Sequence, residues 1–377
     1  MAPAQGPEPD TRPRIALLVG GPPAGIMHIR AEGLTCEAHH VFDLKVFTHA
    51  SGRGKVRDVL SMTAELLRFR PRAMYVLNTG AIGIPALVVR GLTGAPFVVD
   101  TGDLAYRFVR VMGYFGPARR LWIGFTEWLL ITMASAVVVR GRFHRTLLIR
   151  HTAKPVVHIP DGVDVASRVS GDTAAERARR GWDGKITIGF LGVVSWSEQH
   201  DWGLGKELVE AVRLLGGERF HGVVIGDGSG RPYLEELART LQVEGAISFV
   251  GSVPYADLPR ELSMIDICLV TSVEDESWEV RTTGKLPEYL AAGRIVVATQ
   301  VGEAKWVLDP EQILPYHGIG DPDYAGRLAE HIGRLALNWP APLAVASESG
   351  PRLAREYFDY HVLSPRWVAV MNALIGR

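Results

Sequence analysis

The sequence predicts an α/β fold made of two doubly wound, Rossmann-like domains. Short apolar runs of the kind that form buried strands alternate with helical patterns along the whole chain. The alternation is broken once, by a polar stretch rich in Arg and Ala. The chain has 377 residues, of which 47% are hydrophobic, and this is enough to bury two cores. We therefore predict a first domain over residues 14–165, a linker over 166–184, a second domain over 185–350 and final helices over 351–377.

Composition and charge exclude several classes of protein. The chain has 41 Lys and Arg and 41 Asp and Glu, so its zero net charge gives no support to a general nucleic-acid binder. Cys36 and Cys268 lie far apart without metal-ligand spacing, which favours a reduced cytoplasmic protein. Residues 1–13 lack the features of a signal peptide and predict a disordered tail. The apolar region 121–139 is interrupted by Glu127, which favours a soluble helix and a strand over a membrane span.

The first domain is predicted to alternate strands and helices, as a doubly wound sheet does. Runs rich in Val and Ile predict strands at Arg14–Val19, Val41–Val46, Ala73–Leu77, Phe97–Val99, Ala136–Val139 and Val156–Ile159. Apolar residues at helical spacing predict helices at Ile26–Leu34, Lys55–Phe69, Ile82–Leu92 and Leu121–Ala134.

A glycine-rich loop follows the first predicted strand. The dinucleotide pattern G-x-G-x-x-G requires glycine where Pro22 stands, so the loop does not predict an NAD site. Loops at the carboxyl end of a first strand still line the ligand crevice of open parallel sheets. We therefore expect Gly20, Gly21 and Gly25 to form a substrate loop. His28, in the helix that follows, is a candidate base or substrate contact, although a lone histidine is more often structural.

Two further stretches of the first domain are candidates for contact with a ligand. Asp100 and Asp103 follow the strand Phe97–Val99, where they could hold sugar hydroxyls or transfer a proton, or else cap a turn. We take Asp103 as the candidate catalytic residue. Arg107–Arg120 mixes arginines with aromatic residues, which suits an anionic membrane surface or a phosphorylated acceptor. The same mixture also suits a solvated face over core aromatics.

The second domain repeats the alternation, and each of its strands is followed by a glycine-bearing loop or a polar turn. The predicted strands are Ile186–Leu191, Gly222–Ile225, Ile247–Val250, Ile267–Val270 and Ile295–Ala298. The predicted helices are Lys206–Leu215, Tyr233–Leu241, Leu258–Met264 and a short one that begins near residue 284. Because the strands are expected to be parallel, these loops should gather at one edge of the sheet.

The short helix carries the strongest candidate binding residues. Gly284 opens it, and Gly293 fits the left-handed residue that ends a helix. Free backbone N–H groups at the helix start, together with Lys285, would attract an anion such as a phosphate. One turn further on, the Glu288 carboxylate could accept hydrogen bonds from a ribose diol. The alternative is a surface helix with a Lys–Glu pair three residues apart.

Several motifs occur together in a known family. They are I-P-D-G-V-D at residues 159–164, V-V-I-G-D-G at 223–228, F-V-G-S-V at 249–253 and K-L-P-E-Y-L-A-A-G at 285–293. As a set they resemble the second domain of glycosyltransferase family 4, also called group 1, which has the GT-B fold of two Rossmann-like domains facing each other across a cleft. The resemblance implies transfer of a sugar from a UDP- or GDP-linked donor to an acceptor hydroxyl. It also implies retention of the anomeric configuration, no metal, and no cofactor beyond the nucleotide-sugar co-substrate.

The resemblance also implies roles for individual residues. Glu288 matches the second glutamate of the family's E-x7-E motif, which binds the ribose, and Lys285 lies where the diphosphate is contacted. The remaining donor-binding positions are then Gly284, Gly226, Asp227, Gly228, Val250, Gly251 and Val253. In the first domain, Asp103, His28 and the loop of Gly20, Gly21 and Gly25 are expected to face the acceptor.

The sequence departs from the family pattern at three places. Val280 stands where the family has the glutamate that grips the donor sugar, with Glu279 beside it as a candidate substitute. Residues 192–203 lack the two cations that usually bind the diphosphate. The candidates to replace them are Arg281, Lys285 and Lys206. The frequent His-Asp pair of the first domain appears as Gly102-Asp103, without the imidazole.

Alternatives therefore stay open. The same fold also serves nucleotide-sugar epimerases, and the missing cations suit a catalytically silent partner subunit of a glycosyltransferase. A sugar-containing, a lipid-linked or a small-molecule acceptor would each suit the first domain. No metal site is predicted, because the acidic run 274–276 is more typical of a solvated loop. We expect a cytoplasmic protein, held peripherally on the inner membrane face if Arg107–Arg120 contacts lipid.

Overall fold

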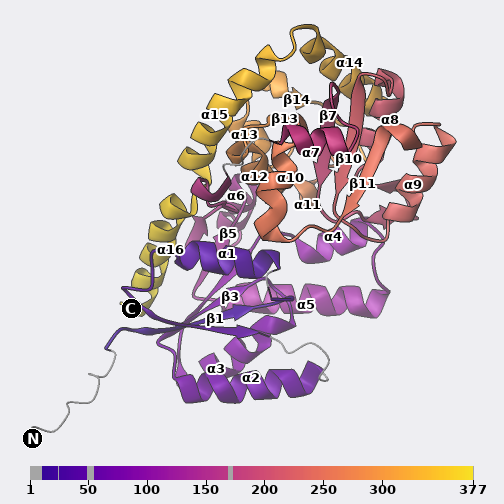
Figure 1. Cartoon of the computed structure of the whole chain (residues 1–377). Coiled ribbons are helices and arrows are strands. Elements are labelled where there is room, and N and C mark those ends of the chain that lie inside the picture. Colours follow the sequence, from indigo (N-terminus) through magenta and orange to yellow (C-terminus); the bar gives the residue numbers. More distant parts are fainter. Residues whose placement is uncertain (1–10, 24, 49–54, 169–172, 377) are drawn as a thin grey trace, which may run out of the picture.

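The computed structural model describes residues 11–23, 25–48, 55–168 and 173–376. They form two six-stranded parallel sheets, each with helices on both faces, and the two layered units meet along one side (Figure 1). The predicted α/β class with two doubly wound sheets is therefore confirmed. Most of the predicted N-terminal tail, residues 1–10, lies outside the described residues.

The first sheet has the strand order β2-β1-β3-β4-β5-β6. In chain order this domain contains β1 (Arg14–Val19), α1 (Ile26–Thr35), β2 (Asp43–Thr48), α2 (Lys55–Phe69), β3 (Ala73–Leu77), α3 (Ile84–Thr93), β4 (Phe97–Thr101), α4 (Ala105–Val111), α5 (Pro117–Met133), β5 (Ala136–Val139), α6 (Arg142–Ile149) and β6 (Val156–His158). Its strands alternate between two cores, since Ile15 and Leu17 pack with α1 whereas Ala16 and Leu18 pack with α2, α3 and α5.

The second sheet has the strand order β11-β10-β7-β12-β13-β14. The rest of the chain contains α7 (Ala174–Arg179), β7 (Ile186–Leu191), β8 (Trp196–Ser197), β9 (Trp202–Gly203), α8 (Lys206–Leu215), β10 (Phe220–Ile225), α9 (Arg231–Thr240), β11 (Ile247–Gly251), α10 (Leu258–Ser263), β12 (Ile267–Val270), α11 (Glu276–Glu279), α12 (Lys285–Ala291), β13 (Ile295–Thr299), α13 (Ala304–Val307), β14 (Ile313–Leu314), α14 (Tyr324–Leu337), α15 (Ala341–Tyr357) and α16 (Tyr360–Ile375). The carboxyl ends of β7, β10 and β11 bring their glycine-bearing loops to one edge, beside the polar turn that follows β12.

The last two helices connect the two units. Helix α15 packs against α12 of the second domain, and α16 then runs beside α1 of the first (Figure 1). Leu363, Trp367 and Met371 of α16 are fully buried in the first domain's core. The Trp367 ring meets Phe42 and Tyr75 edge to face, with ring centroids 5.9 and 5.5 Å apart. Helix α16 is therefore part of the same core as β1 and α1.

Within the described ranges, no helix is long and apolar enough to cross a membrane. The predicted helix and strand over residues 121–139 are observed as α5 and β5. Both cysteines are free thiols, with Cys36 exposed and Cys268 in the core.

Candidate functional site

Lys285 lies at the glycine-lined edge of the second sheet. It is the first residue of α12, and its ammonium lies over the Phe190 ring, 4.2 Å from the ring centroid. The described residues provide no hydrogen-bond acceptor or carboxylate in contact with Nζ. Burial lowers the pKa of Lys285 to about 7, with a further contribution from the positive charge of Arg281. A desolvated amine without an anionic partner is suited to bind one from outside the protein.

Three glycines explain why backbone can pack closely around this amine. A Cβ on Gly192 would lie 3.6 Å from Lys285 Nζ, and one on Gly226 would lie only 1.9 Å from the carbonyl oxygen of Gly192. A Cβ on Gly228 would lie 2.3 Å from the Val194 carbonyl oxygen. All three glycines also have φ between +130° and +160°, which other residues rarely adopt. Two predicted donor-binding glycines, Gly226 and Gly228, therefore hold the loop after β7 against the loop after β10.

The other predicted donor-binding residues at this edge differ in exposure. Asp227 is exposed, and its side chain accepts a hydrogen bond from the Gly228 N–H at 2.7 Å. Gly251 has φ +82° and its carbonyl accepts a hydrogen bond from Gly226 N–H at 2.8 Å. Val250 and Val253 are half-buried and pack against the core beneath α12. Strands β10 and β11 are thus tied together where their loops begin.

Glu288 is buried rather than turned to bulk water. Arg168 Nη2 donates to Glu288 Oε1 at 3.1 Å, and the Tyr255 hydroxyl donates to the same oxygen at 2.7 Å. Arg168 Nε lies 2.6 Å from Oε2, although Oε2 receives no aligned hydrogen bond from a described residue. The Arg168 guanidinium also lies over the Tyr255 ring, 4.3 Å from its centroid. Burial raises the pKa of Glu288, and Arg168 and Tyr255 oppose this change.

Sequence reasoning missed Arg168 and Tyr255. Arg168 lies in a 3₁₀ turn, Ala166–Arg168, at the start of the predicted linker, and it carries no motif. A buried carboxylate needs a partner, so the prediction of a buried Glu288 could have prompted a search for an arginine. Its position 120 residues earlier in the chain could not be deduced from spacing.

Both carboxylate oxygens of Glu279, the candidate substitute for the missing sugar-binding glutamate, are engaged within the protein. Its Oε2 accepts a hydrogen bond from the Gly302 N–H at 3.1 Å, and its Oε1 pairs with Lys305. Val280 is fully buried, and its carbonyl oxygen packs against Gly141 of the first domain. Both residues therefore have structural contacts on the side of α13 and the domain interface.

Arg281 and Asp103 contact each other across the two domains. Arg281 Nε lies 2.7 Å from Asp103 Oδ1, and the guanidinium lies 4.4 Å from the Phe108 ring centroid and 5.0 Å from that of Trp278. Asp103 is held from its own side by the Thr101 hydroxyl, which donates to its backbone carbonyl at 3.0 Å. The structure thus places a predicted donor-side cation and a predicted acceptor-side carboxylate in one ion pair.

Helix α4 is part of the same interface. Arg107 pairs with Asp275 and Glu276, and the Phe108 ring meets the Trp278 ring with centroids 5.5 Å apart. Met112, just after α4, is buried in the second domain's core. The first part of the segment, residues 107–114, is therefore an interdomain contact, whereas residues 115–119 are exposed. The acidic run at 274–276 is likewise engaged in ion pairs and a helix cap rather than being simply solvated.

The glycine loop of the first domain is compact, and His28 lies beside it. Gly25 N–H donates to the Pro22 carbonyl at 3.0 Å, and Gly21 has φ +94°. A Cβ on Gly20 would touch only Ile82 at 3.7 Å. His28 Nδ1 is buried and has no hydrogen-bond partner among the described residues.

His144 is a second unpaired imidazole that sequence reasoning missed. It lies in the first turn of α6, just beyond the carboxyl end of β5, and is fully buried. Neither ring nitrogen has a partner in the described structure. Burial lowers its pKa to about 4, and the charge of Asp103 only partly opposes this. The sequence did hold a signal for His144. It follows a predicted strand, and so lies at the same carboxyl edge of the sheet as Asp103.

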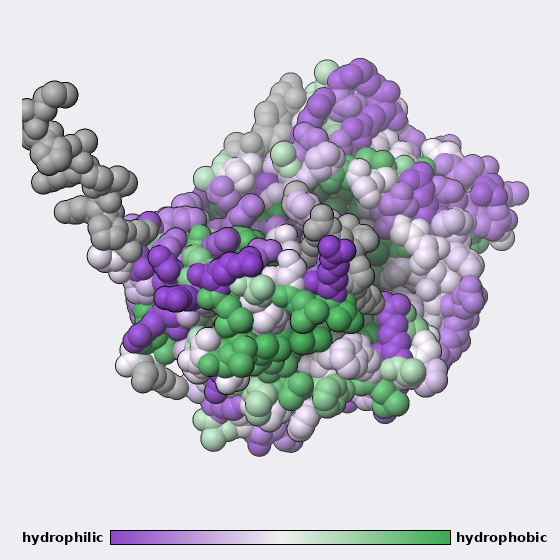
Figure 2. Space-filling model, turned by 90° about the horizontal axis from the view of Figure 1, so that it is seen from below, coloured by the Kyte–Doolittle hydropathy of each residue, from purple (hydrophilic) through white to green (hydrophobic). Residues whose placement is uncertain are grey.

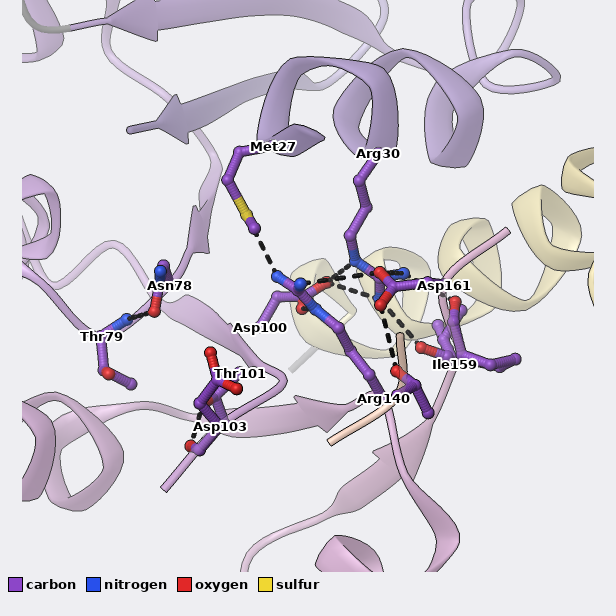
Figure 3. Close-up of polar contacts among 12 residues, drawn as sticks. Met27, Arg30, Asn78, Thr79, Asp100, Thr101, Asp103, Arg140, Ile159 and Asp161 are labelled. Carbon is purple, nitrogen blue, oxygen red and sulfur yellow. Dashed lines mark hydrogen bonds and ion pairs between the residues drawn. The ribbon is translucent and has the colours of Figure 1, made fainter. Parts of the chain in front are cut away.

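Asp100 has a structural role instead of a ligand-binding one. Arg30 Nε and Arg140 Nε donate to its two oxygens at 2.9 Å each, and the Tyr75 hydroxyl donates at 2.5 Å (Figure 3). Arg30 also reaches Asp161 in the connection between the domains, 3.4 Å away. Burial alone would raise the pKa of Asp100, but the two arginines outweigh it and lower the pKa. Arg30, Arg140, Asp100 and Asp161 thus form a cluster whose charges cancel, and Asp103 lies apart from it in the same view.

Among the described residues, one group of side chains has ligand atoms close enough together to hold a metal ion, and it lies on the surface. Cys36, Glu37 and His361 have ligand atoms within 4.8 Å of one another, on the exposed junction of α1 and α16. His361 Nδ1 and Glu37 Oε1 are 2.7 Å apart, so these two side chains are already hydrogen-bonded to each other. This group lies on the first domain, whereas Lys285 and Glu288 belong to the second.

Comparisons with known proteins agree with this geometry. Residues 185–338 match the family described as Glycosyl transferases group 1. The chain is 25% identical over 225 residues to 2-deoxystreptamine glucosyltransferase from Streptomyces kanamyceticus, a match that covers 58% of this chain and 54% of the relative. The chain thus spans about half the length of this curated relative.

Solved structures share the fold over nearly the whole chain. Sucrose-phosphate synthase from Thermosynechococcus elongatus has a TM-score of 0.75 at 16% identity, covering 97% of this chain and 100% of that one. HepE from Anabaena, in complex with UDP and glucose, has a TM-score of 0.74 at 17% identity, covering 96% and 100%. The group 1 match thus lies in the second domain, and the two parallel six-stranded sheets together with these neighbours show that the chain has the GT-B fold.

Proposed function

We propose that this protein transfers a sugar from a UDP-sugar to an acceptor hydroxyl, with retention of the anomeric configuration and without a metal. The observation that carries the proposal is the half-buried Lys285 ammonium, which has no anionic partner and lies against Gly192 at the glycine-lined edge. A nucleotide diphosphate supplies the negative charge that this site lacks. UDP is favoured over GDP because HepE, a structural neighbour, was solved with UDP and with UDP-glucose.

The chemistry follows from where charge develops. As the bond between the anomeric carbon and the diphosphate oxygen breaks, negative charge grows on the phosphate, and Lys285 stabilises it. Arg281 supplies a second cation when the diphosphate displaces Asp103 from their ion pair. The acceptor oxygen bonds to the anomeric carbon on the same face, and its proton passes to the leaving phosphate oxygen. The protein then contributes position and charge rather than a nucleophile.

Glu288 is proposed to bind the ribose with help from its neighbours. Arg168 and Tyr255 fix the carboxylate and occupy Oε1, while Oε2 keeps lone pairs without an aligned hydrogen bond. Because Oε2 is buried and lies 2.6 Å from Arg168 Nε, a ribose hydroxyl donates to it once Arg168 shifts on nucleotide binding. Arg168 and Tyr255 would act as positioning residues for the nucleotide.

Asp103 and His28, with the Gly20, Gly21 and Gly25 loop, are proposed to face the acceptor. Asp103 becomes free to accept a hydrogen bond from the acceptor hydroxyl once Arg281 turns to the diphosphate. Sugar-containing, lipid-linked and small-molecule acceptors are all compatible with this site. A cytoplasmic location remains a prediction that rests on the unpaired cysteines.

Calorimetry with UDP, GDP and their sugars tests the donor. We expect UDP to bind and Lys285→Ala to weaken binding at least about tenfold, because one charge-assisted contact to phosphate is lost. Lys206→Ala is the matched control, since Lys206 Nζ already donates to the Asp201 carbonyl at 3.0 Å. Failure of every nucleotide and nucleotide sugar to bind would refute the proposal.

Product analysis separates the rival activities. NMR of the glycoside formed with a panel of acceptors should show the donor's anomeric configuration retained. Conversion of the donor to its epimer without any acceptor would identify an epimerase instead. Donor binding with activity only after a second protein is added would identify a partner subunit.

A further inference from the structure

Helix α5 carries an exposed apolar face. Leu121, Trp122, Phe125 and Trp128 lie on one side at helical spacing, and each exposes between 51% and 66% of its surface. The rings are neighbours, since Trp122 and Trp128 each lie about 6 Å from Phe125, at 6.2 and 6.1 Å between centroids. The face of the molecule seen from below also shows a broad hydrophobic area (Figure 2). A group of exposed aromatic residues of this kind marks an interaction site.

From Leu121 onward, no exposed charge interrupts the outward side of α5. Between Leu121 and Met133 the sequence has one ionisable residue, Glu127, and it is buried. Its two oxygens accept hydrogen bonds from the N–H groups of Ala105 and Tyr106, at 2.7 and 3.0 Å, and so cap α4. Helix α5 therefore lacks the polar outer face that a helix on the surface of a soluble protein normally has.

The charge of α4 and α5 is mainly positive. Residues 104–133, which include both helices, contain four arginines and one acidic residue, the buried Glu127. Arg119, in the first turn of α5, is exposed and lies 3.7 Å from the Phe115 ring centroid. Tryptophan beside arginine is the combination that anchors proteins at the boundary of lipid headgroups and acyl chains. Basic charge favours the anionic headgroups among them.

We propose that α5 docks this protein onto the surface of a membrane that contains anionic lipids. Trp122, Phe125 and Trp128 enter the boundary between headgroups and acyl chains, and the exposed Arg119 in the first turn of the same helix meets the phosphates. This surface shares Arg119 with the segment Arg107–Arg120 expected from the sequence, but its aromatic residues lie beyond that segment. In that segment Arg107, Phe108 and Met112 are engaged with the second domain.

Co-sedimentation of the full chain with lipid vesicles tests the proposal. We expect binding to vesicles of phosphatidylcholine and phosphatidylglycerol, weaker binding to phosphatidylcholine alone, and a loss of binding at high salt. The triple variant W122S/F125S/W128S should bind about tenfold more weakly or worse. Trp306→Ser is the matched control, because Trp306 is 58% exposed on α13 of the second domain, and it should bind as the wild type does.

Two readouts keep this test independent of folding and of the donor. The triple variant should keep its circular-dichroism melting curve and its UDP affinity, because α5 provides no residue of the proposed donor site. Absence of wild-type binding to any vesicle would overturn the proposal, and so would unchanged binding of the triple variant. Light scattering that shows a dimer abolished by the triple variant, without vesicle binding, would assign the face to a second copy of the chain instead.

Discussion

Raising the pH should weaken nucleotide binding through one side chain, Lys285. In the empty protein its pKa is about 7, because burial and the neighbouring Arg281 disfavour the charged form. A bound diphosphate favours the charged form and brings the pKa back toward its ordinary value. Only the protonated amine then binds well. With a pKa of about 7 in the free protein and about 10.4, the ordinary lysine value, in the complex, affinity should fall about 50-fold between pH about 7 and about 9, or about 2.3 kcal/mol.

Isothermal titration with UDP across this pH range measures the effect. Proton uptake on binding should approach one at the alkaline end, which is determined by repeating the titration in buffers of different ionisation enthalpy. Lys285→Arg should bind with little dependence on pH, because a guanidinium stays charged throughout. Lys285→Ala should bind UDP weakly, and its affinity should not depend on pH over this range.

A wild-type affinity that does not change with pH would refute this reasoning, as would an equal slope in Lys285→Ala. The empty protein offers a second check with the opposite sign. The unfolded chain keeps a proton on Lys285 up to about pH 10.5, whereas the folded protein releases it near 7. The contribution of Lys285 to stability should therefore rise with pH over this window. The melting-temperature advantage of Lys285→Met over wild type should shrink accordingly.

Three other variants probe contacts around the site. Arg168→Ala leaves the Glu288 carboxylate buried without its cation, so it should lower the unfolding free energy, measured by urea titration, by about 3 kcal/mol. Adding Glu288→Gln should restore much of this loss. A loss under about 0.5 kcal/mol would contradict the buried pair. Asp100→Asn removes the charge between two buried arginines and should cost at least about 3 kcal/mol by the same measurement, so a wild-type melting curve would be incompatible with the cluster. Gly226→Ala puts a methyl group 1.9 Å from a carbonyl oxygen and should weaken UDP binding at least about tenfold, whereas Gly245→Ala, where a Cβ meets nothing within 4 Å, should bind normally. Equal affinities in the two glycine variants would show that the loop does not shape the donor site.

Local patterns were sufficient to predict the fold class. The apolar runs that predicted strands at 73–77, 136–139 and 186–191 match β3, β5 and β7 to the residue, because buried parallel strands are nearly continuous in Val, Ile and Leu. The hairpin of β8 and β9 was missed because its strands are two residues each and hold no periodic pattern. Helix α4 was missed for another reason. Its apolar residues are divided between two domains, since Phe108 packs on Trp278 of the second domain and Tyr106 lies against α5 of the first, so they follow no single-domain face.

The candidate site was predicted in part. Lys285 and Glu288 could be found because helix signals and family motifs coincide on them, and neither is turned to bulk water. Their partners could not be found, because Arg168 is brought to Glu288 by tertiary folding. Glu279 illustrates the same limit. Its charge suggested a ligand contact, but Gly302 and Lys305 take up both oxygens.

The path of α16 constrains how this chain can acquire its structure during synthesis. Leu363, Trp367 and Met371 complete the core that β1 and α1 begin, so the amino-terminal half lacks an essential part of its interior until α16 has been synthesised. The carboxyl-terminal sheet has no such dependence on α16 for its own interior. The half made first by the ribosome is therefore the half that must wait to finish folding, and cutting the gene between the two sheets would leave a fragment with an open core.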